Sequence, residues 1–454
     1  MTSTSTTPAR TAGRRSGRRP RVLIIVQNLP VPFDRRVWLE CQALTAAGYD
    51  VSVVCPKGKG DAEREVLEGV TILRYRPYAP GGRAAGFVVE YIWSFTATAR
   101  LVLGARRSGR FEVLQACNPP DIFWPLARWL RLRDRTRFVF DHHDLCPELF
   151  DSRFPGGARL ARRGLVALER ATFRTADHVV STNGSYAQVA VDRGGKARDD
   201  VTVVRTGPDP VKLRRRAAVP ELKRGRRHLV AYLGVMGPQD GVDLAVRAAH
   251  HVVHVLGRTD VAFTFMGGGD CHADLLALRD ELGLRDYVEL PGRVPDETVL
   301  DVFSTADLGL SPDPYNPLND VSTMNKTLEY MAFGLPVVAF DLKETRVSAE
   351  DAAVYVPDGD IDGYARAVVE LLDDPPRRRA MGDIARARIE GAFGWPYQRT
   401  AYVQVYDHLV GRAPVPQARV VAFPDTEAAG TAASAAARAE RAPEVHPSVA
   451  GLDD

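Results

Sequence analysis

The chain has 454 residues and a net charge of +3, and 45% of its residues are hydrophobic and 26% charged. These values are ordinary for a globular protein, so they exclude collagen-like, mucin-like and wholly disordered chains. Five cysteines are scattered without a C-x-x-C pair. This pattern argues against a disulfide framework or a zinc knuckle and favours a reducing, cytoplasmic compartment.

The two ends differ from the body of the chain. Residues 1–20 hold five arginines, no acidic residue and no apolar period, and they are predicted to form a disordered basic tail. Residues 412–454 are rich in alanine and are also predicted to be disordered. The body between them is close to neutral, so no nucleic-acid partner is expected. No apolar run approaches about eighteen residues, so no membrane-spanning helix is expected.

The first part of the body alternates short apolar runs with helical patterns. Fully apolar strands flanked by helices are typical of a parallel sheet covered on both faces. Residues 21–207 are therefore predicted to form a doubly wound, Rossmann-like domain. A helix is predicted at 37–47, and strands are predicted at 21–26, 51–54, 70–75, 113–116, 138–141, 178–181 and 201–205.

This alternation of strands and helices stops in a Pro- and Arg-rich stretch at 208–228, which is predicted to be a linker. It restarts in residues 229–390, which are predicted to form a second Rossmann-like domain. Ligands of such sheets bind at the carboxyl ends of the strands, so two facing domains predict a cleft. Strands are predicted at 229–233, 262–266, 288–290, 308–310, 337–340 and 353–356.

The aromatic segment 87–103 is predicted to be a core helix by its composition. The alternative is an interfacial segment that docks near a lipid-linked acceptor. Residues 397–410 carry apolar side chains at spacings of three and four, which predicts an amphipathic helix.

Two common classes of nucleotide-binding protein are excluded by their missing motifs. The loop 27–34 has no glycine, so G-x-G-x-x-G is absent after the first strand, and no Walker A motif is present. Three glycines at 267–269 follow a later strand, but position 272 is histidine. These glycines either let the turn pass close to a ligand or only allow the turn to close tightly, and both interpretations stay open.

The densest motif spans residues 319–339 (NDVSTMNKTLEYMAFGLPVVA). A polar loop enters a short helix, which is predicted to end at Gly334. Asn325, Lys326 and Glu329 lie in its first turns, where orphan N–H groups and the helix dipole favour a phosphate. Lysine for phosphate and glutamate for ribose would suit a nucleotide sugar. The alternative is a surface helix with an ion pair between Lys326 and Glu329.

This motif resembles the donor-binding motif of the family 4 glycosyltransferases, which are retaining enzymes of the GT-B fold. In that family, E-x(7)-E places two glutamates on the nucleotide sugar. Glu329 matches the second glutamate, whereas Val321 stands at the first and Asp320 is one residue away. The run that begins at Asn325-Lys326 is similar to a subset with N-K-x-x-E-Y-M-A, which includes amino-sugar and deoxy-sugar enzymes.

The resemblance implies a GT-B fold, α/β, with two doubly wound Rossmann-like domains facing a cleft and the acceptor side on the first. It also implies that the helix within residues 391–411 crosses back to the first domain; the alternative is that this helix ends the second domain. Relatives clamp the diphosphate with two basic residues, which are replaced here by Val235 and Asp240. The donor-binding residues expected from the resemblance are Gly237, Gly292, Arg293, Asp320, Ser322, Asn325, Lys326 and Glu329.

In the first domain, His143 resembles the histidine of the family's H-D loop, which contacts the transferred sugar, and His142 lies beside it. The catalytic residues expected are therefore His143, Lys326 and Glu329. A His-His-Asp run could also bind a metal, but no second cluster stands at ligand spacing, so no metal site is expected. Gly292 and Arg293 could equally belong to a plain β-turn. The acceptor-side residues expected are Phe33, Asp34, Arg35, Asn118 and Asp121.

The resemblance implies a retaining transferase that moves a hexose or amino sugar from a nucleotide-diphosphate donor, with UDP favoured, to an acceptor hydroxyl. The expected partners are this donor and a glycan or lipid-linked acceptor, with no cofactor and with peripheral contact at the inner face of the membrane. Cell-envelope or exopolysaccharide synthesis is the expected process. Two alternatives remain: a nucleotide-sugar 2-epimerase of the same architecture, and an inactive donor-binding partner protein, which the substitutions at Val235, Asp240 and Val321 suggest.

Overall fold

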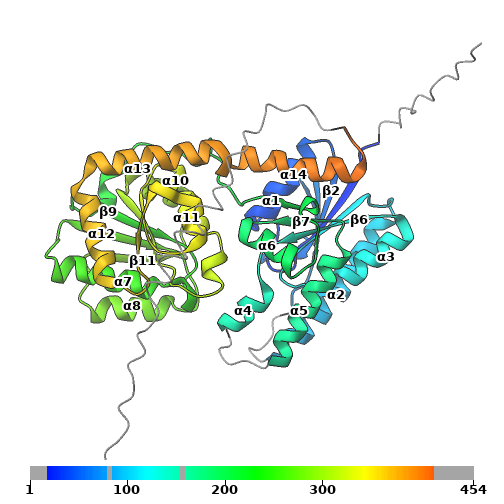
Figure 1. Cartoon of the computed structure of the whole chain (residues 1–454), viewed down its shortest axis with the longest axis horizontal. Helices are drawn as coiled ribbons and strands as arrows, with labels where there is room; N and C mark the ends of the chain where they lie inside the picture. The colour runs from blue at the N-terminus through cyan, green and yellow to red at the C-terminus, as the bar shows by residue number, and fades with distance from the viewer. Residues whose placement is uncertain (1–17, 79–83, 154–158, 414–454) are drawn as a thin grey trace, which may run out of the picture.

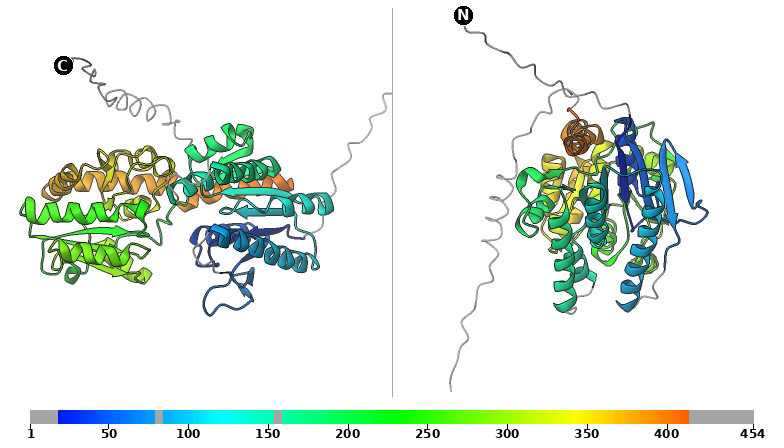
Figure 2. Two further views of the ribbon diagram at one scale, coloured as in Figure 1. Left: turned by 90° about the horizontal axis from the view of Figure 1, so that it is seen from below. Right: turned by 90° about the vertical axis from the view of Figure 1, so that its right-hand side faces the viewer.

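The computed structural model describes residues 18–78, 84–153 and 159–413. These residues form two α/β domains, and a long helical segment runs along both of them (Figure 1). The view from below shows the domains as two lobes (Figure 2). The predicted architecture of two Rossmann-like sheets is confirmed. The predicted tails lie outside the described residues, apart from residues 18–20 and 412–413.

The first sheet has eight strands in the order β3-β4-β2-β1-β5-β6-β7-β8, and every neighbouring pair except β3 and β4 is parallel. The order of the strands in the chain reverses between β1 and β5, and ligands of such sheets bind outside the carboxyl ends of the strands at this point. The strands are β1 (Arg21–Ile25), β2 (Asp50–Pro56), β3 (Arg64–Leu67), β4 (Val70–Tyr75), β5 (Val113–Cys117), β6 (Arg137–His142), β7 (His178–Ser181) and β8 (Val201–Val203).

Strand β3 was not predicted from the sequence. It is an edge strand of four residues, R-E-V-L, and it pairs antiparallel with β4. None of its side chains is buried, so it lacks the apolar run that marks the other strands. The helices of this domain are α1 (Arg35–Ala46), α2 (Ala84–Arg106), α3 (Trp124–Asp134), α4 (Cys146–Arg153), α5 (Arg159–Thr175) and α6 (Gly184–Asp192).

The second sheet has six parallel strands in the order β11-β10-β9-β12-β13-β14. Its strands are β9 (His228–Leu233), β10 (Val261–Met266), β11 (Val288–Gly292), β12 (Leu308–Ser311), β13 (Val337–Phe340) and β14 (Ala353–Val356). The helices are α7 (Val242–His250), α8 (His272–Glu281), α9 (Asp296–Thr305), α10 (Asn325–Ala332), α11 (Lys343–Ala349), α12 (Ile361–Asp373), α13 (Pro375–Arg388) and α14 (Trp395–Val410).

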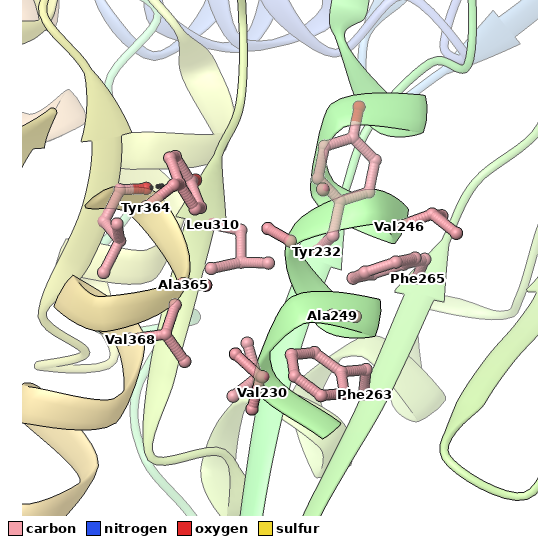
Figure 3. Packing of buried hydrophobic residues seen from close by; sticks show 14 of the residues in the cluster. Val230, Tyr232, Val246, Ala249, Phe263, Phe265, Leu310, Tyr364, Ala365 and Val368 are labelled. Carbon is pink, nitrogen blue, oxygen red and sulfur yellow. Dashed lines mark hydrogen bonds between the residues drawn. The ribbon is translucent and has the colours of Figure 1, made fainter. Parts of the chain in front are cut away.

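The core of the second domain lies between this sheet and the helices that cover it. Figure 3 shows Val230 and Phe263 of the strands close to Ala249 of α7, and Val368 of α12 on the neighbouring side. All four side chains are buried, which fits the continuous apolar runs in the sequence. This packing fixes the strand ends, and the loops of the candidate site start from those ends.

Helix α14 follows the second domain in sequence but packs on the first. Its Tyr402, Val405 and Tyr406 belong to the same buried cluster as Val37 and Leu44 of α1. In Figure 1, α13 lies over the second domain and α14 over the first. The predicted crossing is therefore confirmed, and the alternative, in which the helix ends the second domain, is wrong.

In the described part of the chain, no helix combines the length and the apolar character that crossing a membrane requires.

Candidate functional site

The two domains meet through side chains at the loops after their strands. Arg35, at the start of α1, reaches the second domain: its Nη2 lies 2.6 Å from Oδ1 of Asp296, and its Nη1 lies 3.6 Å from Oε1 of Glu329. Beside it, the guanidinium of Arg293 lies 4.3 Å from the centroid of the Phe33 ring. The loop before α1 therefore contacts the residues that the sequence places on the donor side.

A second contact joins α6 to the loop before α10. The Asn183 side chain donates hydrogen bonds to the carbonyl of Val321 (3.0 Å) and to Oγ1 of Thr323 (3.1 Å). The hydroxyls of Tyr186 and Ser322 lie 2.9 Å apart. The first domain thus holds this loop from one side, and α10 starts directly after it.

Lys326 is the charged residue in the first turn of α10. Its Nζ lies 2.5 Å from Oδ1 of Asp313 and 5.3 Å from the centroid of the Tyr232 ring. The exposed fractions of the Lys326 and Asp313 side chains are only 9% and 2%. A buried carboxylate needs a partner charge, so Lys326 neutralises Asp313 in this structure.

The N-terminus of α10 has unpaired backbone donors. The residue before the helix, Met324, makes no side-chain capping bond, and Asn325 is exposed. The Thr327 N–H already donates to the Met324 carbonyl (3.0 Å), whereas the N–H groups before it have no intrahelical acceptor, so the uncapped start leaves those available to an anion. At the other end, Gly334 adopts φ +63°, and the predicted helix end is confirmed.

Glycines of two neighbouring loops bring their backbones into contact beside Lys326. Gly267 has φ +135°, and a Cβ there would lie 1.8 Å from the carbonyl oxygen of Gly234. A Cβ on Gly234 would in turn lie 3.1 Å from Cε of Lys326. Of the two interpretations of the glycine run 267–269, these contacts favour a tightly closed turn at Gly267.

Asp240 turns back onto its own loop. Its Oδ2 accepts a hydrogen bond of 2.8 Å from the backbone N–H of Gly237. Burial raises the pKa of the Asp240 carboxyl, and the positive charge of Lys326 lowers it. Asp240 therefore closes a turn, and the Gly237 N–H is already occupied by this carboxylate.

Three other expected donor residues have structural contacts of their own. Oδ1 of Asp320 accepts from the N–H of Lys343 (3.0 Å), at the start of α11. The Ser322 hydroxyl donates to the carbonyl of Leu318 (2.7 Å), in addition to its contact with Tyr186. Gly292 has φ +74°, and its carbonyl accepts from the Gly267 N–H. Their expected contacts with a donor remain predictions.

Glu329 lies one turn further along α10 than Lys326, with 23% of its side chain exposed. Burial raises the pKa of its carboxyl, and the charge of Arg35 lowers it. Glu329 is thus a partly exposed carboxyl that faces a cation from the opposite domain. Such a group can accept hydrogen bonds from sugar hydroxyls once Arg35 moves away.

His143 is held by a buried ion pair in the first domain. Its Nε2 lies 2.5 Å from Oδ2 of Asp141, and Nη2 of Arg36 lies 2.8 Å from Oδ1 of the same carboxylate. Nε of Arg36 also lies 2.9 Å from the His143 ring. Asn118 accepts from the N–H of His143 at 2.6 Å and so fixes the loop.

Sequence reasoning gave no role to Asp141, and it placed Arg36 only at the end of the loop 32–36 that would line the acceptor side. The available signals were the adjacent arginines Arg35-Arg36 and the carboxylate that ends β6, directly before the two histidines. Arg36 and Asp141 are both buried, and a charged residue in a core is informative because such residues are seldom buried without a partner.

The residues that the structure describes include one cluster with metal-binding side chains, namely Cys117, Asp141 and His143, whose ligand atoms lie within 4.8 Å of one another. The Arg36 guanidinium contacts the Asp141 and His143 atoms of this cluster. It already supplies the positive charge, and it would repel a metal cation. The set is therefore better described as an arginine-centred ion-pair cluster.

His142 packs in the core among aromatic rings. It is fully buried, and its ring lies 5.1 Å from that of Phe173 and 5.3 Å from that of Tyr186, between centroids. Burial lowers the pKa of His142 to about 3, so this ring is neutral near pH 7. Of the two neighbouring histidines, only His143 is partly exposed.

The expected acceptor-side residues fall into two groups. Phe33 and Arg35 are exposed and face the second domain. Asp34 caps α1 by accepting from the N–H of Val37, and Asn118 supports the His143 loop. Asp121 is only 5% exposed, and burial raises the pKa of its carboxyl to about 7. Whether any of the five touches an acceptor stays a prediction.

Two family models match most of the described chain. The model described as glycosyl transferase 4-like domain matches residues 34–207, and the one described as glycosyl transferases group 1 matches residues 227–374. The boundary between the two matches coincides with the boundary between the two sheets.

Three similar proteins illustrate the range of these matches. D-inositol 3-phosphate glycosyltransferase of Kineococcus radiotolerans is 29% identical over 54% of this chain and 60% of its own length. Alpha-D-kanosaminyltransferase of Streptomyces kanamyceticus is 32% identical over 35% of this chain and 40% of its own length. The match thus spans less than two thirds of either relative. Anabaena HepE, solved with UDP and glucose, superimposes with a TM-score of 0.62 at 15% identity, over 86% of this chain and 100% of that one.

Proposed function

The chain belongs to the group 1, GT4-like glycosyltransferases of the GT-B fold, and we propose that it moves a hexose or amino sugar from a UDP-linked donor to an acceptor hydroxyl with retention of configuration. The observation that carries the proposal is the position of Lys326 and Glu329 on the uncapped first turns of α10, where the two domains meet. The same helix offers backbone donors for phosphate and a carboxylate for sugar hydroxyls.

UDP and an amino sugar are supported by similar proteins. HepE was solved with UDP and glucose, and a kanosaminyltransferase is among the matching relatives. The run Asn325-Lys326 before Glu329 supports the same class of donor, because it is similar to the subset with amino-sugar and deoxy-sugar enzymes. Cell-envelope or exopolysaccharide synthesis is part of the proposal.

The proposed chemistry uses electrostatic stabilisation of the leaving diphosphate. The N–H groups at the start of α10 and the ammonium group of Lys326, which is paired with Asp313 in this structure, act where negative charge develops as the bond to the sugar breaks. His143 hydrogen-bonds the transferred sugar, while Asp141 and Arg36 hold its ring in place. If the acceptor hydroxyl attacks the sugar from the face that the diphosphate leaves, no protein nucleophile is needed. Val321, which stands where relatives have the first glutamate, therefore limits donor affinity more than the reaction itself.

A lipid-linked acceptor is supported by the surface of the first domain. Helix α2 exposes Val89, Ile92, Trp93 and Leu103 along one face. Helix α5 exposes five arginines and Leu160. Both helices project from the same end of this domain in Figure 1 and in the right-hand view of Figure 2. Apolar side chains beside basic ones suit an anionic membrane surface, so we propose peripheral contact there.

The deciding experiment measures thermal unfolding of the full chain with UDP-, GDP-, TDP- and ADP-sugars, each with and without EDTA. A ligand that binds the folded state raises the unfolding midpoint. We expect UDP-sugars to raise the unfolding midpoint, and we expect EDTA to have no effect on this rise. We also expect the chain to transfer the sugar to an acceptor present in a cell extract. A rise in the midpoint without sugar transfer to any acceptor would favour the alternative of an inactive donor-binding protein. No rise with any nucleotide sugar would contradict the proposed function.

A further inference from the structure

The second domain brings two cations to the donor site, Lys326 and Arg293, and the charge of Lys326 is already paired with a carboxylate. Lys326 is neutralised by Asp313 at 2.5 Å, and both side chains are almost fully buried. Asp240 and Glu329 add two carboxyl groups nearby. Val235 stands where relatives carry a basic residue. The group around Lys326 therefore carries no net positive charge. Apart from Arg293, which stacks on the Phe33 ring, a further cation beside the phosphates has to come from the first domain.

Arg35 of the first domain is placed to be that cation. Its guanidinium lies 3.6 Å from the Glu329 carboxylate, and Glu329 follows Lys326 by three residues on the same helix. Its other partner, Asp296, is 79% exposed, and 63% of the Arg35 side chain is exposed as well. Exposed ion pairs are weak, so exchanging Asp296 for phosphate costs little.

The neighbouring contacts keep Arg35 at this position. Asp34 caps α1 by accepting from the N–H of Val37, which fixes the backbone at the start of the helix. On the other side, the Phe33 ring lies under the guanidinium of Arg293. The loop is thus fixed at its base, while the Arg35 side chain can change partners through rotation about its own bonds.

We propose that Arg35 binds the diphosphate of the donor, moving from Asp296 and Glu329 to the phosphate oxygens when the nucleotide enters. This inference rests on the proposed function. The guanidinium fork suits phosphate bidentately, and its departure frees Glu329 to accept from sugar hydroxyls. This movement of the Arg35 side chain then links the two domains through the bound donor. It gives the diphosphate a cation and leaves Glu329 free for the sugar.

A purely structural role for Arg35, as a latch between the domains, makes different predictions. A latch would be weakened equally by loss of Arg35 and by loss of Asp296. A phosphate ligand would be lost with Arg35 alone, because Asp296 competes with the phosphate for the same guanidinium. The two variants therefore separate the two roles.

The test is calorimetric titration of the full chain with UDP and GDP, and with uridine and guanosine as phosphate-free probes. We expect Arg35→Gln to weaken binding of the diphosphate about tenfold or more and to leave nucleoside binding unchanged, because a charge-assisted contact is lost. We expect Asp296→Asn to leave diphosphate binding unchanged or tighter. The matched control is Arg216→Gln, since Arg216 pairs with the adjacent Glu297 at 2.5 Å and lies outside the site.

The inference alone would be overturned if Arg35→Gln binds the diphosphate as the wild type does, or if Arg35→Gln and Asp296→Asn weaken binding to the same extent. Loss of nucleoside binding in Arg35→Gln would also overturn it, because the effect would then not depend on phosphate. A wild-type chain that binds neither diphosphate contradicts the proposed function itself. Unfolding midpoints of all variants show whether each one folds.

Discussion

The hydroxyl of Tyr402 lies 2.6 Å from Oε1 of Gln115, which joins α14 to β5 in the middle of the first sheet. The amide nitrogen of the same Gln115 donates to Oε2 of Glu40 (2.7 Å) and to Oδ2 of Asp141 (3.1 Å). Asp141 is also the carboxylate that holds His143. The C-terminal helix and the candidate catalytic histidine therefore share one buried hydrogen-bond network.

Removing the Tyr402 hydroxyl tests the polar part of this contact. We expect Tyr402→Phe to lower the free energy of unfolding by only about 1 kcal/mol, since Tyr406 also donates to Gln115. Tyr402→Ala removes a fully buried ring, and we expect it to cost about 3–5 kcal/mol. Denaturant unfolding measures both. Equal losses in the two variants would mean that ring packing contributes nothing.

The pair of Lys326 and Asp313 separates phosphate binding from stability. We expect Lys326→Gln to weaken UDP binding about tenfold or more, through loss of a charge-assisted contact, and to destabilise the fold, because Asp313 is left buried and unpaired. Adding Asp313→Asn restores a neutral pair and should recover the unfolding midpoint without recovering UDP affinity. Recovery of both the unfolding midpoint and the UDP affinity would show that Lys326 affects binding only by stabilising the fold.

His143 should affect turnover more than donor binding. We expect His143→Gln to lower kcat by about 10²-fold or more, because a positioned hydrogen bond to the reacting sugar is lost, and to leave UDP affinity nearly unchanged. Asp141→Asn should lower kcat less, because it only loosens the ring. His254→Gln is the control, because this histidine of the second domain contacts the Gly283 carbonyl and none of the site residues named above. Full activity in His143→Gln would remove this residue from the mechanism.

Asp121 gives the protein a defined dependence on pH. Burial raises the pKa of its carboxyl to about 7 from the ordinary 3.8, so between these values only the folded state keeps the proton. Raising the pH through this window therefore favours unfolding, with a slope of at most about 1.4 kcal/mol per pH unit from this group.

Asp121→Asn removes this titration. The difference in unfolding free energy between Asp121→Asn and the wild type should grow in favour of the variant from about pH 4 to about pH 7 and then level off. The Asp286→Asn variant, at an exposed position, is the control for loss of a surface carboxyl. A difference independent of pH would show that Asp121 keeps an ordinary pKa.

The exposed face of α2 predicts binding to anionic vesicles. We expect Ile92→Asp to weaken co-sedimentation of the full chain with vesicles of phosphatidylglycerol about tenfold or more, since it replaces an apolar side chain that is 61% exposed. Val255→Asp changes a similarly exposed residue of the second domain and should have no effect. Equal binding of both variants and the wild type would argue against this surface.

Most of the fold could be predicted from the sequence because thirteen of the fourteen strands are apolar runs at regular intervals. Strand β3 could not, since its R-E-V-L sequence is stabilised only by pairing with β4. The helix in residues 319–339 was predicted with its end at Gly334, because both the polar loop and the terminating glycine are local signals.

The site was predicted less completely, because its contacts join residues far apart in the chain. Nothing local to Lys326 indicates that Asp313 neutralises it, and nothing local to Arg35 indicates that Glu329 faces it from another domain. Asp34 and Asp320 carry ordinary capping contacts at helix starts, which a motif cannot distinguish from ligand contacts. Residue types were therefore easier to predict than partners.

The position of α14 has a consequence for synthesis on the ribosome. The side chains of Val37 and Leu44 are covered by α14, which emerges only after the whole second domain. A nascent first domain therefore exposes these apolar side chains until residues 395–410 have emerged, which makes it a natural target for chaperones that bind such surfaces. The order of translation therefore delays complete folding of the first domain until the second domain has been synthesised.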